Sequence, residues 1–143
     1  MTGCSTPDNS EPPAELTPIK NPVSVKTLWT ADSGQGAVKK FLDMQPLIVA
    51  GRVYSIDTQG LISRWKTDKG TLEWSLESGL KATAGLTGDS SRLVATSRNG
   101  EVELFDYNNQ GLKQRWKHQL GGEIRTRAVL SGEQVFVRTV DGK

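Results

Sequence analysis

The segment GRVYSIDTQG (residues 51–60) indicates the fold, because related segments return twice further along the chain. They are SRLVATSRNG (91–100) and EQVFVRTVDG (133–142). Each is rich in β-branched or aromatic residues and ends in a polar pair followed by glycine, as expected of a strand entering a tight turn. The glycines that close the segments are separated by 40 and 42 positions: Gly60, Gly100 and Gly142.

Three tryptophans keep nearly the same step. Trp29, Trp74 and Trp116 are separated by 45 and 42 positions. Short strands within a repeat of about 40–45 residues are typical of the four-stranded blade of a β-propeller. A flat indole at one place in every blade would fill the wedge between neighbouring blades. The alternative, three core tryptophans in a single β-sandwich, gives no reason for the glycines to keep the same register.

The predicted fold class is all-β, with blades of four antiparallel strands, because no segment shows a sustained helical period. We expect residues 25–31 to form an outer strand of the first blade, and residues 33–45 to be a loop or to hold a short helical turn. The other strands are predicted at 46–51, 52–57, 61–66, 71–77, 81–88, 92–97, 101–107, 112–120, 123–130 and 134–140.

The composition divides the chain into two parts. Residues 1–23 hold five of the six prolines among Ser, Thr, Asn and Glu, and are predicted to form a flexible N-terminal tether. Residues 24–143 are predicted to form the first part of a propeller, about three blades. Because closed propellers typically have about four to eight blades, we expect the chain to be the front of a longer protein, cut inside its third blade. An intact mass of the natural protein near 15.6 kDa would contradict this.

Several classes of function receive no support from the composition. The formal net charge is only +2, with the charges dispersed, whereas a nucleic-acid surface would be clustered and basic. No run of about 18 apolar residues is present to span a bilayer as a helix. A single cysteine and a single histidine, His118, leave no internal disulfide and few options for a metal site or a catalytic triad within this chain.

The lone cysteine lies at the head of the tether. Thr2-Gly3-Cys4 resembles the end of a bacterial lipobox, in which small residues admit the signal peptidase and the thiol receives the lipid. We therefore predict Cys4 as the lipidation site of the natural protein. The alternative is an unmodified cysteine near a disordered end.

A family resemblance rests on the segments around the tryptophans. TDKGTLEW (67–74) resembles the repeat signature of quinoprotein-like propellers, an Asp or Asn, a glycine, and a tryptophan four residues later; NNQGLKQRW (108–116) is similar but one residue longer. Arg64 and Lys66 depart from the small residue and the Asn or Asp usual near those places. Together with the lipobox and the tether, the chain resembles the lipoprotein propellers of the outer-membrane β-barrel assembly machinery of Gram-negative bacteria. Residues 47–74 resemble their first blade and 120–143 the opening of their third.

The resemblance implies an eight-bladed, non-catalytic scaffold without cofactor or metal, lipid-anchored at the periplasmic face of the outer membrane. It implies as partners the periplasmic domains of the barrel-inserting subunit, with nascent outer-membrane proteins as further candidates, and no nucleic acid. The partner-binding loops of the family lie in later blades, so no such residue is assigned here. Two alternatives are a quinone-dependent dehydrogenase-type propeller and a surface propeller that binds protein or carbohydrate.

Other residues favour structural roles. The acids at turn positions, Asp57, Asp68, Asp106 and Asp141, suit turn chemistry better than a metal site. Trp65 and Phe105 each stand five residues after a repeat glycine and are predicted to pack between blades, like Trp29, Trp74 and Trp116. His118 is expected on an outer strand, in solvent. Lys39, Lys40, Arg125 and Arg127 could form basic patches, although ordinary solvated charges are the simpler interpretation.

Overall fold

The computed structural model describes residues 11–18, 20, 23–36 and 42–142. Within these ranges the chain forms ten β-strands and no helix, which confirms the all-β prediction. The strands are β1 Leu47–Val49, β2 Arg52–Ile56, β3 Leu61–Lys66, β4 Leu72–Glu77, β5 Thr87–Gly88, β6 Arg92–Thr96, β7 Glu101–Asn108, β8 Gly111–Gln119, β9 Val129–Ser131 and β10 Gln134–Phe136.

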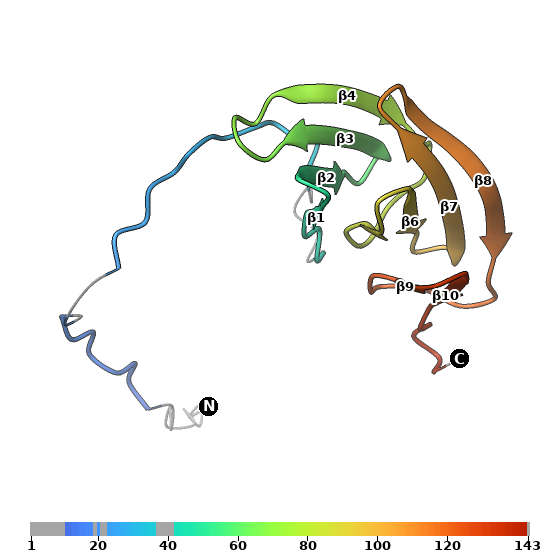
Figure 1. Cartoon of the computed structure of the whole chain (residues 1–143). Helices are drawn as coiled ribbons and strands as arrows, with labels where there is room; N and C mark the ends of the chain where they lie inside the picture. The colour runs from blue at the N-terminus through green and yellow to red at the C-terminus, as the bar shows by residue number, and fades with distance from the viewer. Residues whose placement is uncertain (1–10, 19, 21–22, 37–41, 143) are drawn as a thin grey trace, which may run out of the picture.

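Eight of the strands form two sheets of the same design. The first sheet has the order β1-β2-β3-β4 and the second β5-β6-β7-β8, each an antiparallel meander. Both have a register shift at the same place, between Arg64 and Trp65 in β3 and between Leu104 and Phe105 in β7. The sheets stand side by side, with β4 and β8 along the outer rim and β1, β2 and β6 inside (Figure 1). These are the predicted blades of four antiparallel strands.

The third unit contributes a hairpin within the described residues. β9 pairs with β10 around a turn at Gly132, and an isolated bridge joins Ile124 to Thr139. The hairpin lies beside the second sheet, where β9 contacts β5 (Figure 1).

The core lies between the sheets. Tyr54, Ile56 and Ile62 of the first sheet pack against a cluster from the next unit that includes Leu93, Ala95 and Phe105. The opposite face of the second sheet presents Val94, Val102 and Leu104 to Ile124 and Ala128 of the third unit. Because alternate residues of a strand point to opposite faces, the second sheet packs against a neighbour on each face, as an inner blade of a propeller does.

The repeat glycines occupy one kind of turn. The Gly60, Gly100 and Gly142 amides donate to the carbonyls of Asp57, Ser97 and Thr139, at 3.2, 3.2 and 3.1 Å. All three glycines have positive φ, between 83° and 95°, which side chains rarely adopt. The carbonyls of Gly60 and Gly100 then accept from the Ser78 and Leu120 amides, both at 2.8 Å, where the chain leaves β4 and β8.

The predicted strand at residues 25–31 is wrong. No strand is assigned there, and the outer strand of the first sheet is β4, which comes from later in the chain. Instead, the Trp29 Nε1 donates to the Thr67 carbonyl at 2.8 Å, and its ring lies against Gly70 in the β3–β4 turn. The described residues before it, at 11–18 and 23–28, are exposed, without regular structure, and run away from the sheets (Figure 1).

Candidate functional site

The strand order brings two kinds of connection to one end of the sheets. The turns between the second and third strands of the first two units, at 57–60 and 97–100, lie beside the segments that lead to the next sheet, at 78–83 and 120–125. We call this end the connection face. The opposite end, where β1 turns into β2 and β3 into β4, is called the hairpin face.

Asp57 organises the first turn of the connection face. Its side chain accepts hydrogen bonds from the amides of Gln59, Leu61 and Gln35, at 2.9, 2.8 and 2.9 Å. Burial by itself would raise the pKa of the Asp57 carboxyl, but these amides and that of Gly60 together outweigh burial, so the pKa lies below its ordinary value. In the second unit Ser97 takes this place and accepts from the Glu101 amide at 3.2 Å. The Asp57 carboxylate and the Ser97 hydroxyl therefore stabilise their turns.

The connection face contains a pocket of about 470 Å³, lined by turns of the first two units and by Glu123 and Arg125 at the start of the third. One wall holds Thr58 and Gln59 from the first turn, and another holds Arg98 and Asn99 from the second. Lys81 donates from its ammonium to the Gln59 side-chain oxygen at 2.6 Å. The walls are therefore mainly polar groups carried on turns that the two sheets hold in place.

Two arginines of this pocket converge on one carboxylate. Arg125 donates from Nε and Nη2 to the two oxygens of Glu123, at 2.9 and 3.1 Å. Arg98 forms an ion pair with the same carboxylate through its own Nε. The hydrogen bond from Arg125, assisted by that from Arg98, outweighs burial and lowers the pKa of Glu123 below its ordinary value. With Lys81, three cations thus share the pocket with one anion.

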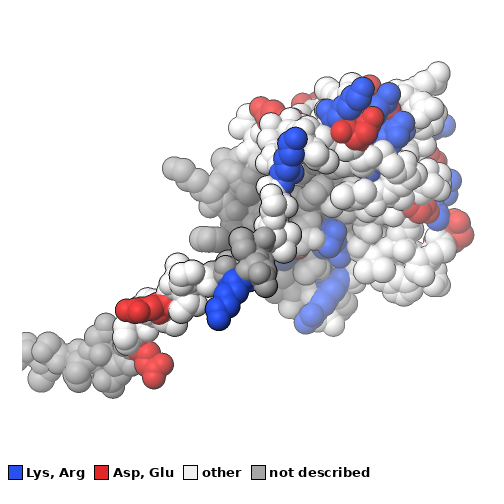
Figure 2. Space-filling model, turned by 60° about the vertical axis from the view of Figure 1, so that its left-hand side comes forward, with Lys and Arg blue, Asp and Glu red and all other residues white. Residues whose placement is uncertain are grey.

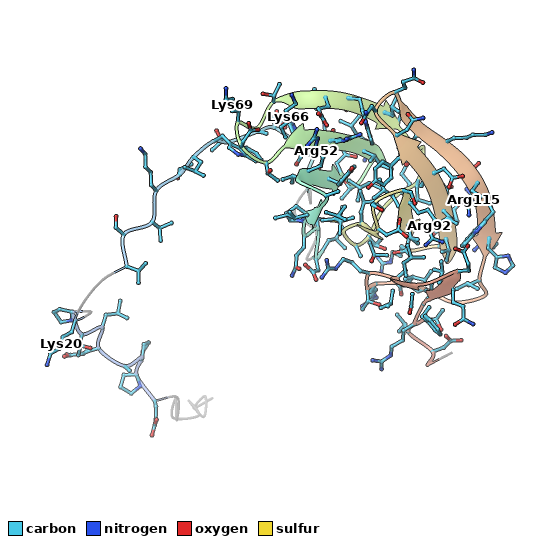
Figure 3. The ribbon with its side chains drawn as sticks, viewed as in Figure 1. Lys20, Arg52, Lys66, Lys69, Arg92 and Arg115 are labelled. Atoms are coloured by element: carbon cyan, nitrogen blue, oxygen red, sulfur yellow. The ribbon has the colours of Figure 1, made fainter. Side chains whose placement is uncertain are left out.

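Cations elsewhere on the sheets also contact carboxylates, and Arg52 and Arg64 share that of Glu73. Arg52 contacts Glu73 at 2.6 Å, Arg92 contacts Asp89 at 2.5 Å and Glu133 at 3.0 Å, and Arg115 contacts Asp106 at 2.8 Å. Figure 3 labels these three arginines. It also labels Lys66 and Lys69, which lie near the β3–β4 turn. In the view of Figure 2, acidic groups lie directly against basic groups at the upper right of the folded body. Such pairs leave little net charge to attract a ligand.

Arg64 joins the first two sheets through a buried contact that sequence reasoning did not anticipate. It stands in β3 where the second sheet has Leu104, since each pairs with its sheet's tryptophan. Its guanidinium donates to the Asn108 carbonyl at 2.9 Å and the Asn109 side chain at 3.1 Å, and lies 2.8 Å from Glu73. The small residue usual near this place is therefore replaced by a charged link between sheets.

The structure places the predicted packing residues as follows. Trp74 and Trp116 are half-buried on β4 and β8; Trp74 packs on the core between the first two sheets and Trp116 on the core between the second and third units. Trp65 and Phe105 are both 4% exposed, each directly after a register shift. Trp116 also lines a shallow apolar groove with Leu120, Val135 and Val137. The role of these side chains as blade-to-blade links stays a prediction.

The remaining predicted positions have mixed outcomes. Cys4, Lys39 and Lys40 lie outside the described residues. His118 is exposed on β8, as expected. Arg125 lines the connection-face pocket, whereas Arg127 donates to the Gln45 side chain at 3.1 Å.

Lys81 and Arg98 were missed as pocket residues. The available signal was the glycine register, which places Arg98-Asn99 and Thr58-Gln59 in equivalent turns of neighbouring blades. Among the residues that the structure describes, no group of three or more His, Cys, Asp or Glu side chains could hold a metal ion. The described part of the chain also has no helix long and apolar enough to cross a membrane.

Sequence comparison supplies the family likeness. No family model matches the chain. "Outer membrane protein assembly factor BamB" of Burkholderia pseudomallei is 30% identical over 139 residues, which covers 97% of this chain. The chain is similar to the N-terminal portion of BamB. BamB of Bordetella pertussis is 27% identical over 144 residues, and BamB of Salmonella typhimurium 26% over 144, covering 99% and 92% of the chain. The chain spans 35–36% of the length of these three relatives.

Solved structures support the same architecture. The crystal structure of BamB from Moraxella catarrhalis matches with a TM-score of 0.57 at 23% identity, over 67% of this chain and 29% of that one. The computationally designed Ika8 protein matches with a TM-score of 0.58 at 18% identity, over 68% of this chain and 30% of that one. At these identities the likeness concerns the fold alone: this chain is part of a β-propeller, as BamB is.

Proposed function

We propose that this chain is the first part of a non-catalytic scaffold lipoprotein that acts in outer-membrane protein assembly. The observation that carries the proposal is the similarity to relatives named as outer-membrane protein assembly factors, which extends over 97% of the chain for the Burkholderia protein. The propeller fold supports it, because side-by-side sheets form a rigid platform that presents turns to a partner. At the connection face the turns at 57–60 and 97–100 are presented in this way, beside a pocket.

The proposal includes an anchor and a partner. Residues 1–23 form the tether, Cys4 carries the lipid, and the blades lie at the periplasmic face of the outer membrane. The partner is the barrel-inserting subunit, through its periplasmic domains, with nascent outer-membrane proteins as a further partner. The exposed course of the described residues 11–18 is compatible with a tether.

A pull-down from detergent-solubilised envelopes, with the full natural protein tagged, tests the scaffold role. Recovery of the barrel-inserting subunit supports it. A Cys4→Ser variant serves as the control: it should lose membrane attachment and acyl labelling, yet still bind the purified periplasmic domains. Retention on a sugar resin without any assembly subunit, or dye reduction after addition of quinone and calcium, would contradict the scaffold role and favour a lectin-like or dehydrogenase-type propeller.

A further inference from the structure

We propose that the pocket of the connection face binds a carboxylate side chain of an acidic, extended polypeptide segment. The pocket lies between the turn at 57–60 of the first unit and the turn at 97–100 of the second. Its recognition groups are the guanidinium groups of Arg98 and Arg125, the ammonium of Lys81 and the hydroxyl of Thr58.

The charge balance of the pocket favours an anion. Its lining contains three cations, Lys81, Arg98 and Arg125, and one acid, Glu123. Lys81 bonds to a neutral amide oxygen rather than to a carboxylate. The positive charge at this end of the sheets is therefore only partly neutralised. Arg92, by contrast, contacts two carboxylates, those of Asp89 and Glu133.

The two arginines are already arranged around a carboxylate. Arg98 and Arg125 both contact Glu123, which shows that their spacing suits a group of this shape. A guanidinium has five N–H donors, and the contacts to Glu123 occupy one on Arg98 and two on Arg125. Because their side chains are 64% and 59% exposed, the remaining donors can meet a second carboxylate from solvent.

Thr58 provides an independent observation. The residue is only 2% exposed and lines the pocket, yet its hydroxyl has no hydrogen-bond partner in the structure. A buried hydroxyl without a partner costs about 1–3 kcal/mol, so native structures seldom retain one without reason. Less than 1 Å² of the hydroxyl oxygen is exposed, so a ligand oxygen at this wall would satisfy it once the Thr58 side chain rotates toward the pocket. The nearby Thr83 hydroxyl, by contrast, donates to the Ile124 carbonyl at 2.9 Å.

A polypeptide is favoured as the source of the carboxylate, and this choice rests on the proposed scaffold function. The cations come from three separate segments, at 81, 98 and 125, and line a pocket of about 470 Å³. Cations spread over three segments suit a polypeptide with several acidic groups better than a small anion, which would be bound by one compact set of donors. A nucleic acid is disfavoured because the formal net charge of the whole chain is only +2.

The test is a fluorescence-anisotropy titration of the purified intact chain with a labelled peptide in which Glu alternates with Gly or Ser. A twin peptide with Gln in place of Glu is the ligand control. Arg98→Gln and Arg125→Gln remove recognition donors, and Arg115→Gln removes the same charge from β8, away from the pocket. Glu123→Gln removes the internal carboxylate, and Thr58→Val removes the hydroxyl at nearly constant volume.

We expect saturable binding of the Glu peptide and at least tenfold weaker binding of the Gln twin, because charged hydrogen bonds carry the recognition. Arg98→Gln or Arg125→Gln should weaken binding about tenfold, and Arg115→Gln less than about twofold. Glu123→Gln should strengthen binding, because it releases both guanidinium groups. Thr58→Val should weaken binding while raising Tm, a combination that a purely structural role would not give.

Three results would overturn the inference: equal losses in Arg98→Gln and Arg115→Gln, unchanged affinity in Glu123→Gln, or full competition by inorganic phosphate at concentrations comparable to the peptide. The last would identify a small-anion site. A wild-type protein that binds the peptide but recovers no assembly subunit from envelopes would refute the scaffold function and leave the pocket standing. The reverse result would refute the pocket alone.

Discussion

Gly60→Ala should cost more folding free energy than the positive φ of the turn alone explains, because the added Cβ would also collide with the backbone of Leu80. A Cβ at Gly60 would lie 2.6 Å from the Leu80 carbonyl oxygen and 2.8 Å from the Leu80 amide nitrogen, and φ at Gly60 is +95°. The left-handed backbone costs alanine about 1–2 kcal/mol, of which about 0.4–1 is offset by the stiffer unfolded chain. Displacing backbone atoms adds about 1–3 kcal/mol. We expect a total loss of about 2–4 kcal/mol.

Gly79 is the matched control for this substitution. It also has positive φ, +76°, but a Cβ there would meet nothing within 4 Å. Gly79→Ala should therefore cost only about 0.5–1 kcal/mol, the backbone part alone. In thermal unfolding followed by circular dichroism, Gly60→Ala should lower Tm by about 10 °C and Gly79→Ala by about 3 °C.

A second site checks the same reasoning in the next unit. A Cβ at Gly100 would lie 2.5 Å from the Leu120 carbonyl oxygen, so Gly100→Ala should resemble Gly60→Ala in its effect. If Gly60→Ala and Gly79→Ala lower Tm equally, the contact between the turn and the following connection is not rigid. The glycine period would then reflect turn conformation alone.

Three further predictions concern the first sheet. Trp74→Ala should cost about 3 kcal/mol in urea unfolding, because the half-buried indole packs on the core between the first two sheets; an unchanged midpoint would mean that this ring does not support the junction. Ala50→Asn should stabilise by about 0.5–1 kcal/mol, since Ala50 and Gly51 both have positive φ in a two-residue turn where Asn-Gly is preferred; a lower Tm would contradict this. The pKa of Asp57 in the folded protein lies below its ordinary value of 3.8, so its carboxylate adds stability above that pH, and this stability is lost as the pH falls through the folded pKa. Asp57→Asn should therefore be less stable than the wild type at pH 6. In paired urea titrations the difference should shrink toward pH 3.

The repeat could be predicted from the sequence because it depends on local chemistry. A turn that needs positive φ selects glycine, and strands that bury both faces select β-branched and aromatic residues, whatever the rest of the chain does. The predicted strands at 52–57, 61–66 and 101–107 therefore agree closely with β2, β3 and β7. The strand predicted at 25–31 failed because a strand needs a pairing edge, which the local pattern of residues does not reveal.

The charged contacts could not be predicted in this way. Arg64 and Asn108 are 44 positions apart, and nothing in the local sequence of either indicates that one will donate to the other. The same holds for the pocket on the connection face, because Arg98 and Arg125 become a pair only when the second and third units pack together. The period of the repeat glycines predicts that two turns lie at the same end of neighbouring blades. It does not predict the rotamers that bring side chains from different units to one carboxylate.

In the first two blades the glycine and tryptophan markers stay in step because one hairpin follows the glycine and holds the tryptophan, whereas Trp29 lies outside any strand. After Gly60 the chain runs down β3, turns, and returns along β4 through Trp74, until the Ser78 amide donates back to the Gly60 carbonyl. The spacing from glycine to tryptophan is thus fixed by the length of a closed β3–β4 hairpin. An insertion in the turn at 67–70 leaves both ends of that hairpin in place, whereas an insertion within β4 moves the indole to the other face of the sheet. We therefore expect a residue inserted after Asp68 to be tolerated, and one inserted after Ser75, between the indole and the Ser78 contact, to separate the first two sheets, as measured by loss of protection of Ile62 and Phe105 amides in hydrogen exchange.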